Sequence, residues 1–266
     1  MINENIILRC EDSIEGMFTA IYDAFVYKNK IQKENNTVYN DTISIEIGQG
    51  ENYTLFSTII DVNTDLVKSR KTVSTIKSRL GENIYGNVFN ALCHYDADRA
   101  TVVLGFLVRA FKVGQRIAEY MSDEYVIRTY EMARKVNNEG QKLNGFLRFS
   151  DNGSFLLSKI APKCNMIPII MWHFQDRFPG ENFVIYDQIR KYAVIHPKGK
   201  GCFFISNEQF MQLEENIPQQ VDIFENLWKI YFESTDIRER LNERCQINLC
   251  PKWYRKNMPE FEEKAI

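Results

Sequence analysis

With 266 residues, the chain is long enough to bury a substantial hydrophobic core without help from disulfide bonds. Its 33 basic and 35 acidic residues leave a formal charge of -2, so any binding of a nucleic acid requires a local basic patch. A composition that is 44% hydrophobic and 26% charged excludes long disordered stretches.

The cysteines and the amino terminus point to a reducing compartment. The six cysteines form no CxxC pair, and the five-residue spacing of Cys245 and Cys250 matches no common metal-ligand pattern even if Cys202 joins them. We therefore predict reduced thiols, no metal site and no cofactor. The start, MINENIILRC, lacks the apolar core of a signal peptide, and no apolar run approaches the roughly 18 residues of a membrane span. We expect a cytoplasmic protein without a membrane partner.

The amino-terminal part begins with a predicted strand over residues 5–10. Asp12 and Ser13 then offer a cap for a helix whose apolar residues recur from Ile14 to Phe25, until the charged tract KNKIQKENN at 28–36 predicts a solvated loop. The alternating sequence ISIEIGQG at 43–50 predicts an edge or half-buried strand.

Residues 64–138 are expected to form almost only helices. Thr64 and Asp65 cap the first, which Gly81 ends; Asp96 or Asp98 begins the second, and Ser122-Asp123 begins the third. Apolar residues at helical spacing in all of them predict a helical bundle.

From residue 139 onward the pattern changes to strands. Asn152-Gly153, between GFLRF and SFLLSKI, predicts a hairpin, and Asn165 is expected to cap a short helix over 166–178. Three further apolar runs predict an antiparallel sheet of four or five strands, and the tail predicts helices over 221–233 and 236–245. The fold class is therefore α+β, with a mostly helical part at 1–138 and a sheet part at 139–266 in one continuous unit.

Two sets of polar residues in the sheet part suggest a site. His173 and Arg177 lie four residues apart on one helix face, where an imidazole and a guanidinium can meet one anion; the alternative is a structural histidine. Asp187 and Arg190 follow a strand, so Asp187 is either a general base or the closing residue of a turn. Arg148 on an apolar strand needs a partner, which is Glu139, Asp187 or a ligand phosphate.

The carboxy-terminal sequence Lys252-Trp253-Tyr254-Arg255-Lys256 mixes two aromatic residues with three bases. Such mixtures bind nucleic acids, although the aromatic side chains also suit docking of the tail on the core. Lys198 and Lys200 lie in a glycine-rich stretch that lacks the spacing of a phosphate loop.

Four segments carry a resemblance to a known family: EGMFTAIYDAF at 15–25, GFLRF at 145–149, the stretch from Pro162 through HFQDRF to IYDQIR at 162–190, and CPKWYRKNMPEF at 250–261. They resemble a bacterial family of probable DNA-metabolism or DNA-repair proteins of unknown activity. Its members are encoded alongside a radical-SAM protein, and some are fused to a uracil-DNA-glycosylase-like domain. The resemblance spans nearly the whole chain.

The resemblance implies that the family's polar set is Glu139, Arg148, His173, Arg177, Asp187 and Arg190. We expect His173, Asp187 and Glu139 to be the catalytic candidates, and the residues that bind nucleic acid or phosphate to be Arg148, Arg177, Arg190, Lys252 and Arg255. Gln141-Lys142 stand where the family has His-Arg, so an imidazole is missing at that place.

Two functions of different class follow. The first is a DNA-metabolism protein that binds DNA or a nucleotide through these residues and acts with a radical-SAM partner. The second is a non-enzymatic scaffold that docks the radical-SAM enzyme and exposes an apolar patch for that purpose.

Overall fold

The computed structural model describes residues 5–35, 43–48, 57–216, 222–235, 237–240 and 242–261. The fold is α+β, as the sequence predicts, and the contacts divide the chain into two compact units, Met1–Asn137 (unit 1) and Asn138–Ile266 (unit 2). Within the described ranges, none of the helices combines the length and the apolar character that crossing a bilayer requires.

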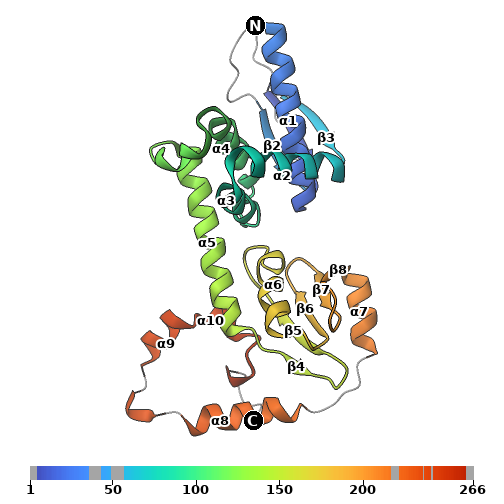
Figure 1. The fold of residues 1–266 in the computed structure, drawn as a ribbon. Coiled ribbons are helices and arrows are strands. Elements are labelled where there is room, and N and C mark those ends of the chain that lie inside the picture. The colour runs from blue at the N-terminus through green and yellow to red at the C-terminus, as the bar shows by residue number, and fades with distance from the viewer. Residues whose placement is uncertain are drawn as a thin grey trace. The chain divides into compact units, whose positions relative to one another are not determined.

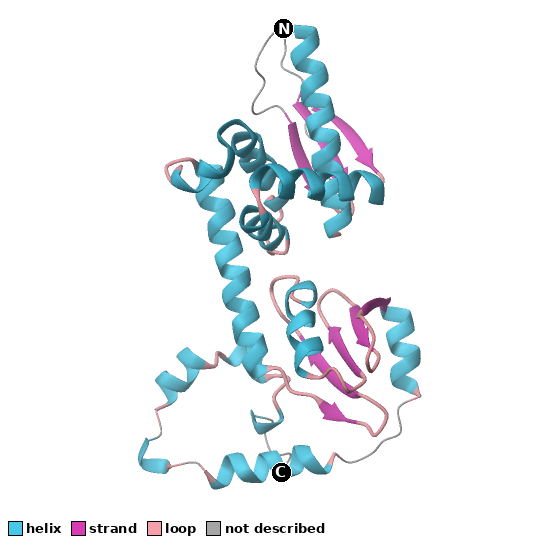
Figure 2. Ribbon diagram, in the orientation of Figure 1, coloured by secondary structure: helices cyan, strands magenta, loops and turns pink. Residues whose placement is uncertain are grey.

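Unit 1 contains a three-stranded sheet of order β2-β1-β3, and β1 pairs in parallel with both neighbours. The elements are β1 (Asn5–Cys10), α1 (Ile14–Asn35), β2 (Ile43–Ile47), β3 (Ser57–Val62), α2 (Leu66–Leu80), α3 (Glu82–Leu92), α4 (Arg99–Val113), the 3-10 helix η1 (Gly114–Glu119) and the beginning of α5 (Glu124–Phe146). Figure 1 shows α1 lying against this sheet, with α2 crossing α1, and Figure 2 separates the helices from the strands by colour.

The core of unit 1 forms where the apolar faces of α1 and α4 meet the sheet. Phe18 and Ile21 of α1, Leu8 of β1, and Phe106 and Leu107 of α4 are all buried in one cluster. A hydroxyl on α4 also satisfies backbone groups of the edge strand β2. Thr101 Oγ1 accepts from Ile45 N at 2.8 Å and donates to Ile45 O at 2.9 Å. Burial of these side chains supplies the main stabilisation of the unit.

The predicted helix boundaries at 65–80 and 123 are confirmed. Asp65 caps α2 through its side chain, Gly81 ends it, and Asp123 Oδ1 accepts from Tyr125 N at the start of α5. The predicted end of the first helix at the charged tract is wrong, since α1 continues to Asn35; lysine, glutamine and glutamate are good helix formers. The rest of the predicted loop, 36–42, lies outside the described residues.

Unit 2 is built on a five-stranded sheet of order β4-β5-β6-β7-β8. Its strands are β4 (Ser150–Asp151), β5 (Leu156–Ile160), β6 (Phe183–Asp187), β7 (Tyr192–His196) and β8 (Phe203–Ser206). Its helices, after the end of α5, are α6 (Ile167–Arg177), α7 (Asn207–Glu215), α8 (Ile223–Ser234), η2 (Arg238–Arg240), α9 (Glu243–Leu249), α10 (Lys252–Arg255) and η3 (Pro259–Phe261).

The sheet is mixed, and the prediction of a purely antiparallel sheet is wrong. The pairs β4–β5, β6–β7 and β7–β8 are antiparallel, but β5 and β6 are parallel. A parallel pair needs a crossover connection, and α6 provides it. The loop that leads from β5 into α6 is therefore a fixed part of the architecture.

Helices cover both faces of this sheet. On one face Phe183 of β6 packs with Phe149, which also contacts Phe174 of α6. On the other, Tyr186 stacks on Phe210 of α7 at 3.9 Å between ring centroids. Side chains alternate along a strand, so these two contacts lie on opposite sides, which explains why every residue of β6 is buried.

Two further local predictions for unit 2 differ from the structure. The predicted strand at 145–149 is instead the end of α5 followed by a loop, because Arg148 Nη1 donates to the carbonyls of Gly145 and Leu147 and closes the helix end. Asn165 does not cap α6; its side-chain oxygen accepts from the Tyr192 hydroxyl, and Met166 occupies the cap position. The predicted hairpin at Asn152-Gly153 is confirmed, since β4 and β5 pair antiparallel across it and Gly153 has φ 81°.

In the tail, the helix predicted over 221–233 corresponds to α8, with residue 221 outside the described part. The helix predicted over 236–245 is wrong, since η2 and α9 stand in that region. Asn242 accepts from Cys245 N and so begins a new helix there. The helices α3 and α7 and the strand β3 were not predicted.

Candidate nucleic-acid interface

The β5–α6 loop, residues 161–166, is held by side chains from three distant parts of unit 2. The first is Trp253 of α10, whose Nε1 donates to Ala161 O at 2.7 Å. This bond ties the tail to the loop, as the docking interpretation of Trp253 and Tyr254 requires. The ring of Tyr254 also packs against Phe146, with 5.5 Å between centroids.

The second holding side chain is Glu139, which comes from the last part of α5. Its Oε1 accepts from Lys163 N and its Oε2 from Cys164 N, both at 2.9 Å. The carboxylate is buried, so these two amides replace the water that it would otherwise bind. Glu139 therefore fixes the backbone of the loop.

The third is Arg190, which donates to the carbonyl oxygens of Pro162 and Lys163. The same guanidinium contacts Asp187 Oδ2 at 3.1 Å, while Asp187 Oδ1 accepts from the amides of Ile189 and Arg190. Asp187 is 0% exposed. The structure thus shows the turn-closing arrangement for Asp187, and with Glu139 and Arg190 it belongs to the support of the β5–α6 loop.

The loop displays Lys163 next to an exposed tryptophan. The Nζ atoms of Lys163 and Lys256 lie 5.8 and 5.6 Å from the ring centroid of Trp253, and Lys142 Nζ lies 5.9 Å from that of Tyr254. We call these five residues the lysine–aromatic surface. Trp253 keeps 42% of its surface exposed, so part of its ring remains accessible to a planar ligand beside two cations.

The lysine–aromatic surface is a surface and not a deep pocket. The cavity beside Trp253 and Tyr254 holds only about 20 Å³, which suffices for about one water molecule. A ligand therefore has to lie on top of these side chains, as a flexible strand does when its bases stack on aromatic rings.

Arg148 pairs with Glu260 of η3, and not with Glu139 or Asp187, the protein partners that the sequence predicts. Its Nε and Nη2 donate to Glu260 Oε1 at 3.1 and 2.8 Å, and its guanidinium lies 5.5 Å from the ring of Trp228. The side chain of Glu260 is 2% exposed. Arg148 therefore joins the end of α5 to η3 and α8.

His173 and Arg177 are exposed on α6, as their spacing predicts. The imidazole packs edge-on against Phe174, at 5.0 Å between centroids, and the Arg177 guanidinium lies 5.6 Å from the Phe178 ring. The hydrogen bonds of Asp187 described above go to Arg190 and to backbone amides. The structure does not bring the six predicted polar residues into one pocket.

The basic residues of the tail divide into two groups. Lys252 is exposed, as are Lys198 and Lys200 in the turn before β8. Arg255 instead points inward, where Nε donates to Cys250 O at 3.0 Å and the guanidinium lies 4.5 Å from the Phe261 ring. Arg255 thus stabilises the tail, while Lys256 supplies the charge next to Trp253.

Sequence reasoning identified Trp253 and Lys256 but missed Lys142 and Lys163. Both lysines come from other elements, α5 and the β5–α6 loop, and reach the aromatic rings only in the folded unit. No local motif marks such residues.

A pH prediction follows from Tyr254. Burial, the charge of Glu139 and the hydrogen bond to it raise the pKa of Tyr254 above its ordinary value of 10.0. The unfolded chain then loses this proton at a lower pH than the folded protein, so the contribution of Tyr254 to the free energy of unfolding is constant well below pH 10.0 and falls as the pH rises through and beyond that value. In Tyr254→Phe we expect a smaller alkaline loss, measured by urea unfolding at about pH 8 and about pH 11. An equal loss in both proteins would contradict this assignment.

A family model matches residues 97–260, which is more than half of the chain. The chain belongs to the DUF4130 family. This family is described as a domain of unknown function. The DUF4130 match includes α4, α5 and the whole lysine–aromatic surface, whereas β1–β3 and α1–α3 lie before it. None of the curated proteins matches the sequence.

Proposed function

We propose that this chain binds nucleic acid, or a nucleotide, through the lysine–aromatic surface. The observation that supports the proposal is the exposed Trp253 ring, whose centroid lies 5.8 Å from the ammonium group of Lys163 and 5.6 Å from that of Lys256. Bases stack on such rings without regard to sequence, and lysines neutralise the phosphates between them. In this proposal a single strand is the preferred ligand, because its bases are free to stack.

The support of the β5–α6 loop also fits this proposal. Glu139 and Arg190 fix the backbone on either side of the Lys163 side chain before any ligand arrives. Preorganised groups lose less conformational entropy on binding. Glu139, Asp187 and Arg190 are thereby positioning residues in the proposal, and His173 and Arg177 are the exposed histidine and arginine of α6.

The family resemblance supplies the setting of the proposal. It implies a role in DNA metabolism, in repair or modification, with a radical-SAM protein as partner and, in some members, a fused uracil-DNA-glycosylase-like domain. The proposed role of the chain is to hold a strand or nucleotide for that partner.

The test measures binding of labelled single- and double-stranded DNA by fluorescence polarisation at several salt concentrations. In Lys163→Ala/Lys256→Ala we expect weaker binding of the single strand, and a salt slope reduced by about 1.4, since each lysine–phosphate contact contributes about 0.7. Trp253→Ala should weaken binding further, while Trp253→Phe, which keeps a ring, should retain most of it.

The matched control is Lys191→Ala/Lys200→Ala, which removes the same charge from exposed lysines outside the lysine–aromatic surface. An equal loss of affinity in both double variants would mean that binding reflects net charge alone. Such a result, or no binding by the unaltered protein, would overturn the proposal.

A second candidate function, docking of the radical-SAM enzyme, is favoured by α8. Phe224, Leu227 and Tyr231 lie three and four residues apart, so they share one helix face, and all are exposed, Phe224 to 72%. Apolar stripes of this kind are typical of helices that bind another protein. In this proposal, Leu227→Ser/Tyr231→Ser prevents co-purification with the radical-SAM protein, whereas Ile189→Ser, at an exposed apolar residue elsewhere, does not.

A further inference from the structure

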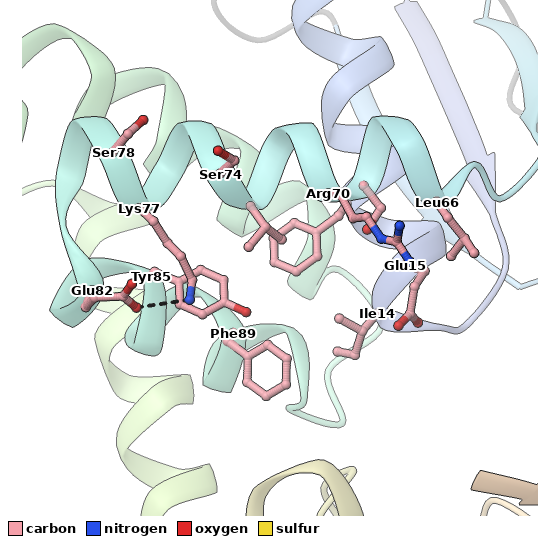
Figure 3. A pocket seen from close by; sticks show the side chains of 13 residues that line it. Ile14, Glu15, Leu66, Arg70, Ser74, Lys77, Ser78, Glu82, Tyr85 and Phe89 are labelled. Carbon is pink, nitrogen blue, oxygen red and sulfur yellow. Dashed lines mark ion pairs between the residues drawn. The ribbon is translucent and has the colours of Figure 1, made fainter. Parts of the chain in front are cut away.

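Unit 1 contains a groove where the start of α1, α2 and α3 meet. Its volume is about 740 Å³, within the range of sites that bind small molecules. Ile14 and Glu15 lie at the α1 end, and Figure 3 shows Tyr85 and Phe89 on the α3 side. The groove lies before the part of the chain that the family model matches.

One wall of the groove is aromatic. The rings of Tyr85 and Phe89 lie 6.0 Å apart, and Tyr85 also stacks on the buried Phe18 at 6.5 Å. Phe18 and the ammonium of Lys77 both lie against the Tyr85 ring, so a planar group entering the groove meets the Phe89 ring and the edge of Tyr85. Aromatic side chains of this kind are the groups on which nucleic-acid bases stack.

The opposite wall is α2, a helix with five basic and no acidic residues. Arg70, Ser74, Lys77 and Ser78 of α2 line the groove, and Figure 3 shows Arg70 and Lys77 reaching into it. Guanidinium, ammonium and hydroxyl groups are the side chains that bind phosphate oxygens.

The two cations differ in availability. Lys77 Nζ is 3.1 Å from Glu82 Oε2 and 4.3 Å from the centroid of the Tyr85 ring, so its charge is already shared. Arg70 is exposed and makes no ion pair with any residue that the structure describes. Arg70 is therefore the group that can receive an anion without breaking an existing contact.

The acidic residues of the groove limit the size of the ligand. Glu15 and Glu82 balance the formal charges of Arg70 and Lys77, so the lining offers a long polyanion no net attraction. A compact ligand with one planar ring system and one phosphate avoids this problem, because the phosphate meets Arg70 while the ring meets Tyr85 and Phe89.

We propose that this groove is a nucleotide-binding site, in which the base packs against Phe89 and the edge of Tyr85, and the phosphate binds Arg70 and the hydroxyl of Ser74. The site is separate from the lysine–aromatic surface and goes beyond the function proposed for unit 2. Its ligand is either a free nucleotide or the phosphorylated end of a strand, which share this chemistry.

The experiment uses the full chain and three probes: AMP, adenosine, and a short oligo(dA) with a 5′-phosphate, each followed by calorimetric titration. We expect a phosphate-bearing probe to bind and adenosine to bind at least about tenfold more weakly, because a charged hydrogen bond contributes about 1.5–3 kcal/mol. Arg70→Ala should weaken the phosphate-bearing probe by a similar factor, and Phe89→Leu should weaken both adenosine and AMP.

The matched control is Lys71→Ala, which removes one cation from the same helix but lies outside the groove, where its Nζ is 5.7 Å from the Tyr22 ring. Binding of AMP that depends on Arg70 identifies a free nucleotide; binding of the oligonucleotide alone, with the same dependence, identifies a strand end. Equal affinities in Arg70→Ala and Lys71→Ala, or no binding of any probe, overturn the site.

Failure of this site is distinguishable from failure of the function proposed for unit 2. If Lys163→Ala/Lys256→Ala abolishes oligonucleotide binding while Arg70→Ala has no effect, only the groove is rejected. If Arg70→Ala abolishes AMP binding while the lysine variant binds strands normally, only the lysine–aromatic surface is rejected.

Discussion

Glu139→Ala is expected to lower the free energy of unfolding of unit 2 by about 1–3 kcal/mol, because it leaves the buried amide of Cys164 without an acceptor, which costs about that much; the partly buried amide of Lys163 loses its acceptor as well. The three tryptophans, at 172, 228 and 253, all belong to unit 2, so tryptophan fluorescence in a urea titration reports on this unit. The same variant should weaken DNA binding, since the loop that displays Lys163 is no longer fixed.

Two controls separate this effect from a general effect on α5. Glu139→Gln keeps one acceptor oxygen and should lie between the alanine variant and the unaltered protein. Glu131→Ala makes the same change at an exposed residue of the same helix and should change stability by less than about 0.5 kcal/mol. A Glu139→Ala protein as stable as Glu131→Ala would show that the loop does not depend on this carboxylate.

Arg148→Ala is expected to lower the free energy of unfolding of unit 2 by about 1.5–3 kcal/mol, the usual contribution of a charged hydrogen bond, because the Arg148 side chain is only partly buried, at 28% exposed. The Glu260 side chain is 2% exposed and would lose its cation, and the carbonyls of Gly145 and Leu147 would lose their donor. Urea unfolding again measures the loss.

A double-mutant cycle identifies the source of this loss. Arg148→Ala/Glu260→Gln removes the unpaired charge, so its loss should be smaller than the sum of the two single losses. Arg177→Ala, at an exposed arginine of α6, is the matched control and should have little effect. Additive losses in the cycle would mean that the two side chains do not stabilise each other.

The elements that the sequence predicts well are those that begin or end at a residue with a specific local role, such as a capping side chain or a glycine. Asp65 and Gly81 delimit α2 through a side-chain cap and a glycine with φ 90°, and Asn152-Gly153 places the turn before β5. Such signals act within a few residues, so they are visible in one sequence.

The elements that the sequence predicts poorly depend on tertiary contacts. The parallel pairing of β5 with β6 is decided by the crossover through α6, and apolar runs of similar composition give no sign of strand direction. The end of α5 depends on Arg148, whose ion-pair partner Glu260 is 112 residues away in the sequence.

The same limit applies to the candidate site. The sequence and the resemblance drew attention to Glu139, Asp187 and Arg190 as polar residues, but their roles depend on which backbone groups they meet. In the structure those groups belong to the β5–α6 loop and the turn after β6. Lys163 becomes a candidate binding residue only in the folded unit, where the loop places it next to Trp253, 90 residues later in the sequence.

The core of unit 1 has a practical consequence for work on the DUF4130 family. The family match begins at residue 97, just before α4, yet Val103, Phe106 and Leu107 of α4 are buried in one cluster with residues of α1, β2 and α3 that precede it. Each of these side chains gains about 1.5–3 kcal/mol from burial. The limits of the match are therefore not those of an autonomous folding unit. A polypeptide trimmed to residues 97–260 would expose the apolar face of α4 to solvent.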